Sequence, residues 1–316
     1  MGDDDVALLP RWIVSEPSSP KRSALAHLAP RGEGTALVES ATSFVARLAL
    51  THRVTVRRLM ADALTGLFPV NATNPSRHRV PLTFWMSESH GLNGLGSLAS
   101  RVVSVLEEQT MRRGLQEMTL VPWRKVLNTR SLLRPVRAWC PVCLHEMKDA
   151  GLAVYEPLVW SIASVTVCAR HGRLEELCPY SDCGTRLRPL AKCMRAGYCS
   201  VCHRWLGSIQ PTNRMCAAPS TGWEVWATNA VGTLLAASST LQAVPQLSWF
   251  GDGVAYYRDL VANGSMTELE RVVGLPSATM QRWCVGDCKP SLDEVLRLSA
   301  ALVTSPHNLL TGNVKG

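Results

Sequence analysis

The sequence predicts a mainly α-helical protein with small zinc-ribbon modules. Three observations support this fold class. Apolar residues recur with helical period near the N-terminus and again near the C-terminus. Between them, residues 140–202 contain eight cysteine or histidine residues in four close pairs, a spacing typical of zinc ligands. The chain has 316 residues, 46% of them hydrophobic, which is enough for several domains with buried cores.

Five segments follow from changes in composition along the chain. Residues 1–33 are rich in Pro, Ser and charge without a sustained period, which predicts an extended arm. We expect an N-terminal helical domain over residues 34–135 and two tandem zinc-binding modules over residues 136–210. A helical connector follows over residues 211–250, and a C-terminal helix-turn-helix domain over residues 251–316.

Two helices are expected at the start of the first domain. Phe44, Val45, Leu48 and Ala49 form one apolar stripe, and the hydroxyls of residues 40–43 offer N-caps. A second helix is expected over residues 55–64. Two short helices with a tight connection fit either a helix-turn-helix-like pair or an ordinary helical hairpin.

A glycine-rich stretch in the same domain is not a nucleotide-binding loop. Gly91, Gly94 and Gly96 precede an apolar helical segment over residues 98–106. A phosphate-binding loop of this kind would have a Lys-Ser or Lys-Thr after the glycines and a strand before them. The sequence has neither feature at this place.

The cysteine pairs predict two structural zinc ions. Thiolates and a neutral imidazole suit Zn²⁺, and four protein ligands leave no position for a catalytic water. Pairing the residues in series closes the most compact loops. The expected ligands are Cys140, Cys143, Cys168 and His171 for the first ion, and Cys178, Cys183, Cys199 and Cys202 for the second.

Two alternatives remain open for the metal region. In a crossed arrangement, the pair at residues 140 and 143 would share an ion with the pair at residues 178 and 183. Cys193 lies six residues before Cys199 and is a substitute ligand in principle, although we interpret it as a spare thiol because it has no close partner of its own.

The C-terminal part of the sequence predicts a series of short helices. Helices are expected over residues 221–237, 266–273, 277–284, 292–302 and 306–310, with a loop over residues 238–253. The expected core of the last domain is Leu269, Val272, Val273, Leu275, Met280 and Trp283.

This order of helices is similar to the helix-turn-helix domains of phage repressors, including Trp283-x-x-Gly286 at the end of the second helix. In such a domain the second helix enters the major groove of DNA. The candidate DNA contacts are therefore Ser277, Thr279, Gln281, Arg282 and Lys289. A module that binds protein through the same helices is the alternative, because residues 277–284 carry a single positive charge.

Charge and composition narrow the functional class. The formal charge of +8 and a pI near 9.1 favour a polyanionic partner such as nucleic acid. No apolar run is long enough to span a membrane, so we expect a cytoplasmic protein, associated with the nucleoid when bound to DNA. The absence of a P-loop, of a nuclease-like acidic triad and of a separate Cys/His pair predicts that the protein is not an enzyme.

Several motifs together resemble the TniQ family (TniQ/TnsD-like proteins). They are Glu39-Ser-x-x-Ser-Phe-x-x-Arg-Leu-Ala49, the Cys-Pro-x-Cys at residues 140–143, Trp160 before Cys168-x-x-His171-Gly172, and the cysteine pattern over residues 178–202. The resemblance covers about residues 23–207. The four residues between Cys178 and Cys183 depart from the two that the family often has.

The resemblance implies a role in transposon target-site selection. A TniQ-like protein would mark a DNA site and recruit an AAA+ ATPase regulator, which brings the transposase. In some elements the family links transposition to a CRISPR effector complex with its guide RNA. The competing interpretation is a transcriptional regulator with structural zinc that reads DNA as a homodimer through its C-terminal helices.

Overall fold

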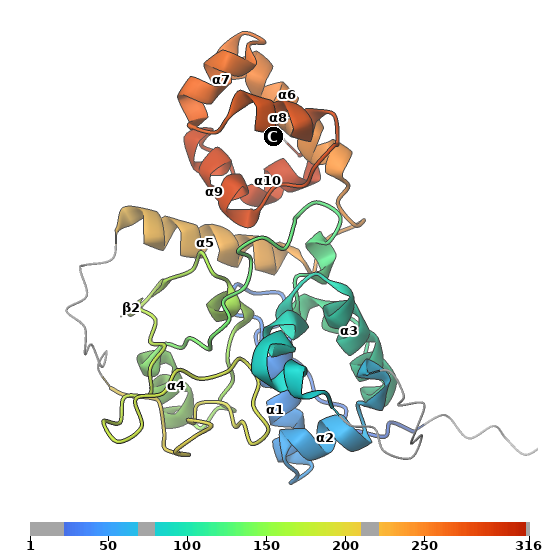
Figure 1. The fold of residues 1–316 in the computed structure, drawn as a ribbon, viewed down its shortest axis with the longest axis vertical. Coiled ribbons are helices and arrows are strands. Elements are labelled where there is room, and N and C mark those ends of the chain that lie inside the picture. The colour runs from blue at the N-terminus through green and yellow to red at the C-terminus, as the bar shows by residue number, and fades with distance from the viewer. Residues whose placement is uncertain (1–21, 69–79, 210–220, 314–316) are drawn as a thin grey trace, which may run out of the picture.

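A computed structural model describes residues 22–68, 80–209 and 221–313 of the chain. The described part consists of helices joined by short turns, with one two-stranded hairpin (Figure 1). Of the expected arm, residues 22–33 form neither helix nor strand, and residues 1–21 lie outside the described part. The mainly helical fold class is therefore confirmed.

The N-terminal helices lie where the apolar pattern places them. They are α1 (Ala41–Thr51), α2 (Val56–Asp62) and α3 (Ser97–Thr110). Ser40 and Thr55 cap α1 and α2, because each side-chain oxygen accepts a backbone N–H three residues later. Buried side chains from all three helices form one apolar core, with Phe44 and Met60 fully buried.

The central region contains little regular structure. It comprises α4 (Pro141–Asp149) and an antiparallel hairpin of β1 (Val167–Cys168) and β2 (Gly172–Arg173), in which Val167 lies opposite Arg173. The first expected zinc ribbon is thus half helical, because Cys140 caps α4 and Pro141 occupies its first turn, where proline is favoured.

Six helices make up the C-terminal part. They are α5 (Gly222–Ala237), α6 (Leu247–Ala262), α7 (Met266–Val273), α8 (Ser277–Cys284), α9 (Leu292–Ala301) and α10 (Pro306–Thr311). A turn at Gly274, with φ of 72°, joins α7 to α8, a backbone conformation that glycine adopts without a steric cost.

The loop predicted over residues 238–253 is wrong in its second half, because α6 begins at Leu247. Its two glycines suggested a loop, but Gly251 lies inside the helix, where it allows close packing on α8. A Cβ at Gly251 would approach the carbonyl oxygen of Trp283 to 2.7 Å. The glycine is therefore explained by helix contact rather than by a turn.

One expected core residue is exposed instead. Val272 is 46% exposed on α7, while Leu269, Met280 and Trp283 are buried as predicted. On α5, Trp223 is 43% exposed and stacks on Trp226.

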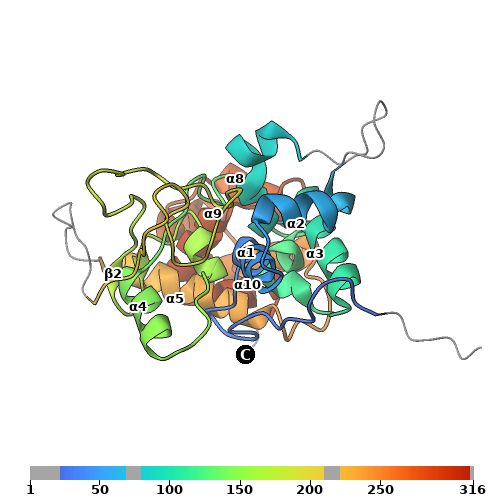
Figure 2. The ribbon, with the colours of Figure 1, turned by 90° about the horizontal axis from the view of Figure 1, so that it is seen from below.

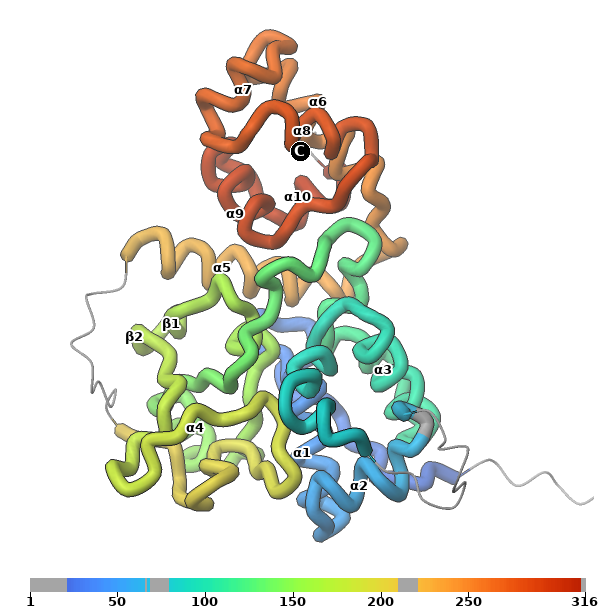
Figure 3. Tube along the Cα trace, in the orientation of Figure 1, coloured from blue at the N-terminus to red at the C-terminus, as the bar shows by residue number. Residues whose placement is uncertain are grey.

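The C-terminal helices α6–α10 form a body that sits above α5, and the rest of the chain lies on the other side of α5 (Figures 1 and 3). Seen from below, α1, α2 and α3 group on one side and α4 with the hairpin on the other (Figure 2). The indole N–H of Trp123 donates to Ser238 Oγ at 3.0 Å, and its ring meets His307 edge-on. These contacts tie the two halves together beside α5.

No described helix is both long and apolar enough to cross a membrane.

Candidate metal centres and the contacts around them

The eight predicted ligands gather into two clusters. Within each cluster the sulfur and ring-nitrogen atoms lie within 4.8 Å of one another. The first contains Cys140, Cys143, Cys168 and His171, and the second contains Cys178, Cys183, Cys199 and Cys202. The grouping is in series, so the crossed arrangement is wrong. Cys193 is exposed and belongs to neither cluster.

Local backbone structure fixes the ligands of the first cluster. Cys140 and Cys143 lie at the start of α4, where the Cys143 N–H points to the Cys140 sulfur at 3.5 Å. Cys168 and His171 lie at the turn of the β1–β2 hairpin. A helix start therefore faces a hairpin turn, and each contributes two ligands.

The second cluster is built from two turns. Backbone N–H groups of Val201 and Cys202 both point to the Cys199 sulfur at 3.4 Å. The Thr185 hydroxyl lies 3.6 Å from the sulfur of Cys183. Such N–H groups stabilise thiolate sulfur and orient it toward a metal.

The distances fit tetrahedral metal binding. Four Zn–S bonds of about 2.3 Å in a tetrahedron place the sulfurs about 3.8 Å apart. Three sulfur–sulfur distances, Cys143–Cys168, Cys178–Cys202 and Cys183–Cys199, are 3.6, 3.6 and 3.9 Å. His171 Nδ1 lies 3.2 to 3.8 Å from the three sulfurs of its cluster. Both clusters are therefore positioned to bind metal ions and are compatible with zinc.

A carboxylate orients the histidine ligand. His171 turns Nδ1 to the sulfurs, and its other ring nitrogen, Nε2, lies 3.2 Å from Glu146 Oε1. Glu146 lies on α4, so the helix that supplies two ligands also orients a third. This carboxylate–histidine arrangement is common around protein zinc sites.

The clusters favour thiolate at three sulfurs, because the pKa values of Cys168, Cys183 and Cys202 are all lowered. Hydrogen bonds from the thiols of Cys140 and Cys143 lower the pKa of Cys168 to about 2. In the second cluster burial opposes ionisation, yet hydrogen bonds from the backbone and side chain of Arg204 lower the pKa of Cys202 to about 6. A four-thiolate site around a divalent ion has a net charge of −2, and Arg204 places a cation beside it.

The motif at residues 39–49 is buried, and its polar side chains form hydrogen bonds with one another. Glu39 is fully buried, and its carboxylate binds Arg47 through two hydrogen bonds of 2.6 and 3.0 Å. Ser43 Oγ also donates to Glu39, at 3.0 Å. The motif therefore stabilises the start of α1, and its polar groups are used internally.

A second buried pair joins the helical domain to both metal modules. Arg137 binds the carboxylate of Glu156, and the backbone N–H of Glu156 donates to Ser43 Oγ at 3.0 Å. The same Arg137 donates to the carbonyl of Tyr198, beside the second cluster, at 2.8 Å. Sequence reasoning missed Arg137 and Glu156, because no spacing rule links two residues 19 positions apart.

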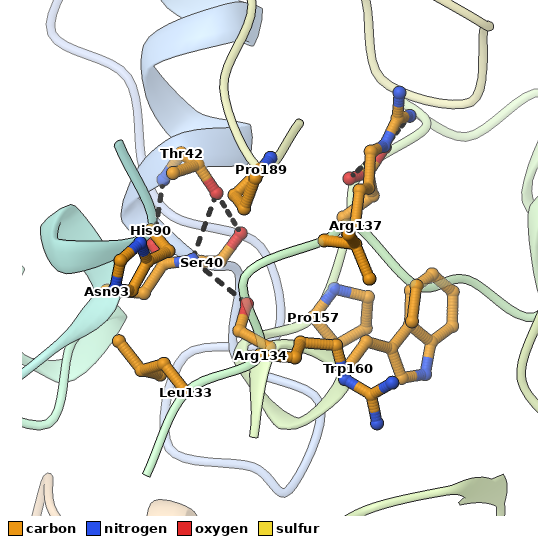
Figure 4. A pocket seen from close by; sticks show the side chains of 14 residues that line it. Ser40, Thr42, His90, Asn93, Leu133, Arg134, Arg137, Pro157, Trp160 and Pro189 are labelled. Carbon is orange, nitrogen blue, oxygen red and sulfur yellow. Dashed lines mark hydrogen bonds and ion pairs between the residues drawn. The ribbon is translucent and has the colours of Figure 1, made fainter. Parts of the chain in front are cut away.

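A narrow pocket lies at this junction (Figure 4). Asn93 spans one side of it, accepting from the Thr42 N–H at 3.0 Å and donating to Ser161 Oγ at 2.9 Å. Pro157 and Trp160 lie on the opposite side, and the guanidinium groups of Arg134 and Arg137 point away from it (Figure 4). The polar groups of the pocket thus connect the segments that line it.

Four of the five predicted DNA contacts lie on α8, and Lys289 lies after it. They differ in exposure and in the bonds that they already make. Gln281 and Arg282 are exposed, although Arg282 pairs with Asp287 at 2.6 Å. Ser277 and Thr279 are partly buried, and the Lys289 ammonium donates to the carbonyl of Arg124 at 2.7 Å. Lys289 therefore fastens the C-terminal body to the segment before α4.

Comparison with known proteins identifies one domain. The TniQ family model matches residues 30–174, which include the buried motif at residues 39–49 and the whole first metal cluster. The second cluster and α5–α10 lie beyond the match. No curated protein matches the chain.

Proposed function

We propose, from the match of residues 30–174 to the TniQ family model, that the protein is a non-catalytic adaptor for DNA transposition. It selects or marks the target site and recruits an AAA+ ATPase regulator, which brings the transposase. The family match carries the proposal. Support comes from the motif at residues 39–49, whose polar groups bond to one another in the interior instead of facing a substrate.

Each cluster would hold one structural Zn²⁺ ion. The donor sets, three thiolates with an imidazole and four thiolates, match closed tetrahedral sites with no position left for a reacting water. Bound zinc would supply folding free energy to a region with few regular elements, and no chemistry. The ions would keep α4, the hairpin and the second module in a fixed relation to the helical domain.

The C-terminal helices α7 and α8 would add a helix-turn-helix contact with DNA. Gln281 and Arg282 are the exposed side chains that support this assignment, because Gln and Arg carry the donors and acceptors that read base edges. Ser277, Thr279 and Lys289 have weaker support, since they are partly buried or already bonded. The protein would find its target DNA by recognising a fixed attachment site, by binding another DNA-bound protein or through a CRISPR effector complex with guide RNA.

A copurification experiment tests the adaptor role. The tagged full-length protein is recovered from cells that carry the whole mobile element, and both the nucleic acids and the proteins that accompany it are identified. Recovery of the AAA+ ATPase of the element supports the proposal. Recovery of an operator-like palindromic DNA near its own promoter, without the ATPase, would favour the transcriptional-regulator alternative.

A further inference from the structure

Two segments of the chain are rich in positive charge. Residues 50–64, which include α2, and residues 184–196 of the second metal module contain seven Lys or Arg and one acidic residue, a net charge of +6. Both segments are short, and they lie far apart in the sequence.

The fold brings these two segments together. The Arg57 N–H donates to the carbonyl of Lys192 at 3.0 Å, so α2 and the 184–196 segment touch. Leu190 and Met194 are buried in the same apolar core as Leu59 of α2. Because the segment is anchored in the core of the helical domain, the position of its cations beside α2 is fixed.

Of the seven cations in these two segments, Arg58 alone makes an ion pair within the described ranges. Arg53, Arg57 and Lys192 are exposed, and none makes an ion pair with another residue in the described ranges. We call these three residues the basic face. Arg58 beside them pairs with Asp62.

Further cations flank the basic face on the second metal module. Arg195 lies over the ring of Tyr198, with 4.2 Å between the guanidinium carbon and the ring centroid. Arg188 bonds to the carbonyl of Met86, two residues from the exposed Glu88. The acidic groups of the adjoining segments are therefore Asp62, already paired, and Glu88 at the margin.

The C-terminal body, in contrast, carries a net negative charge. Residues 246–313 contain five basic and seven acidic residues, a net charge of −2. Each of its four arginines pairs with a carboxylate of the same body, namely Arg258, Arg271, Arg282 and Arg297 with Asp259, Glu268, Asp287 and Asp293. A duplex backbone would meet little attractive charge there.

We propose that the basic face is the surface on which the phosphate backbone of duplex DNA lies, independently of its sequence. This deepens the proposed function and rests on it, because it names where the target DNA would be held. Lys and Arg that neutralise phosphates release condensed counterions, which supplies most of non-specific DNA affinity. On this basis α8 contributes base contacts at most, and the basic face contributes the backbone contacts.

The test measures the affinity of the zinc-loaded full-length protein for a mixed-sequence duplex of about 30 base pairs over a series of salt concentrations. The test variant is the triple substitution Arg53→Gln, Arg57→Gln and Lys192→Gln. The control carries the same change of charge elsewhere, as Arg101→Gln, Arg271→Gln and Arg297→Gln. Metal content and thermal midpoint of both variants verify that they are folded.

Each phosphate contact contributes about 0.9 to the slope of log affinity against log salt. Loss of three contacts should therefore reduce the slope by about 2 to 3 in the test variant and leave it unchanged in the control. Equal slopes in the two variants would overturn the proposal, as would a wild-type protein that prefers RNA of the same length over the duplex.

The adaptor role and the DNA-binding role of the basic face can be refuted independently of each other. A wild-type protein that binds DNA through the basic face but never recruits the ATPase refutes the proposed function and leaves the DNA surface intact. Recruitment of the ATPase by a protein with no affinity for duplex DNA refutes the DNA surface alone.

Discussion

At the residue scale, buried ion pairs explain why polar residues occur in the apolar start of α1. Glu39 is fully buried and receives bonds from Arg47, from Ser43 and from the Arg31 N–H. A buried charge is tolerated only when its hydrogen bonds are satisfied, and removing one partner leaves the other unpaired at high cost. The motif is therefore sensitive to substitutions that keep its volume.

Glu39→Gln should destabilise the protein by about 3 kcal/mol, because the Arg47 guanidinium would stay buried without its counter-charge. Urea unfolding of the zinc-loaded protein measures this. Asp62→Asn, which removes the exposed partner of Arg58, is the control and should cost about 0.5 kcal/mol or less. Similar losses of stability for both variants would contradict the role of the buried Glu39–Arg47 pair in stabilising the start of α1.

The carboxylate of Glu146, which orients His171, gives a second prediction. Glu146→Gln should weaken zinc binding at the first cluster by about tenfold, because the Nε2–H loses its carboxylate acceptor. Competition against a chromophoric chelator measures the affinity of each site. Asp149→Asn, at the exposed end of the same helix, should leave both affinities unchanged. An unaltered first-site affinity in Glu146→Gln would contradict the orienting role.

At the element scale, the sequence was most informative where local chemistry decides the outcome. The hydroxyls at residues 40–43 and an apolar stripe predicted α1, and apolar periodicity predicted α5. Cysteine spacing predicted both metal clusters. The start of α6 was missed, because the role of Gly251 depends on its contact with α8, which no local pattern reveals.

The long-range contacts around the metal clusters could not be predicted from the sequence for a similar reason. Arg137 meets Glu156, and Arg57 meets Lys192, only because the chain folds back on itself. Spacing rules apply to residues within one turn or one metal loop, and these contacts join segments that are 19 and 135 positions apart. Long-range pairs of this kind need the structure.

The start of α5 gives a prediction at this scale. Glu224 closes a capping box with Thr221 and also binds the Thr166 hydroxyl beside β1, which lowers the pKa of Glu224 from its usual 4.5. Glu224→Gln should cost about 1 kcal/mol of stability.

A lowered pKa in the folded state means that the contribution of Glu224 is complete above its unfolded pKa. It is lost only as the pH falls from about 4.5 toward the folded value. The difference in unfolding free energy between wild type and Glu224→Gln should thus be the same at pH 7 and pH 5.5. A difference that shrinks between these two values would contradict the assignment.

At the scale of the whole molecule, the metal clusters act as a brace. Arg137 and Glu156 connect α1 with both modules, and residues of the second module are buried in the N-terminal core. The C-terminal body contributes no residue to either metal cluster. It is attached through the contacts of Trp123 with His307 and of Lys289 with Arg124, and its apolar core continues into that of the first metal module. Loss of metal should therefore affect the two halves unequally.

Chelation of the metal should increase amide hydrogen exchange over residues 136–209 and at the start of α1, because zinc binding supplies much of the folding free energy of such modules. Helices α7–α9 should keep their protection, since their core is made of apolar side chains. Hydrogen exchange measured by mass spectrometry with and without chelator tests this. Uniform deprotection of the whole chain would show that the halves are not separate units.

The central claim is that this protein joins target DNA to an AAA+ ATPase without catalysing a reaction. It is tested most directly by the amount of purified, labelled ATPase retained on duplex DNA beads with the full-length protein present or absent. Retention should depend on the protein and should be lost when Arg53, Arg57 and Lys192 are replaced by glutamine. Retention that is unchanged by adding the protein, at concentrations where it occupies the DNA, would contradict the claim.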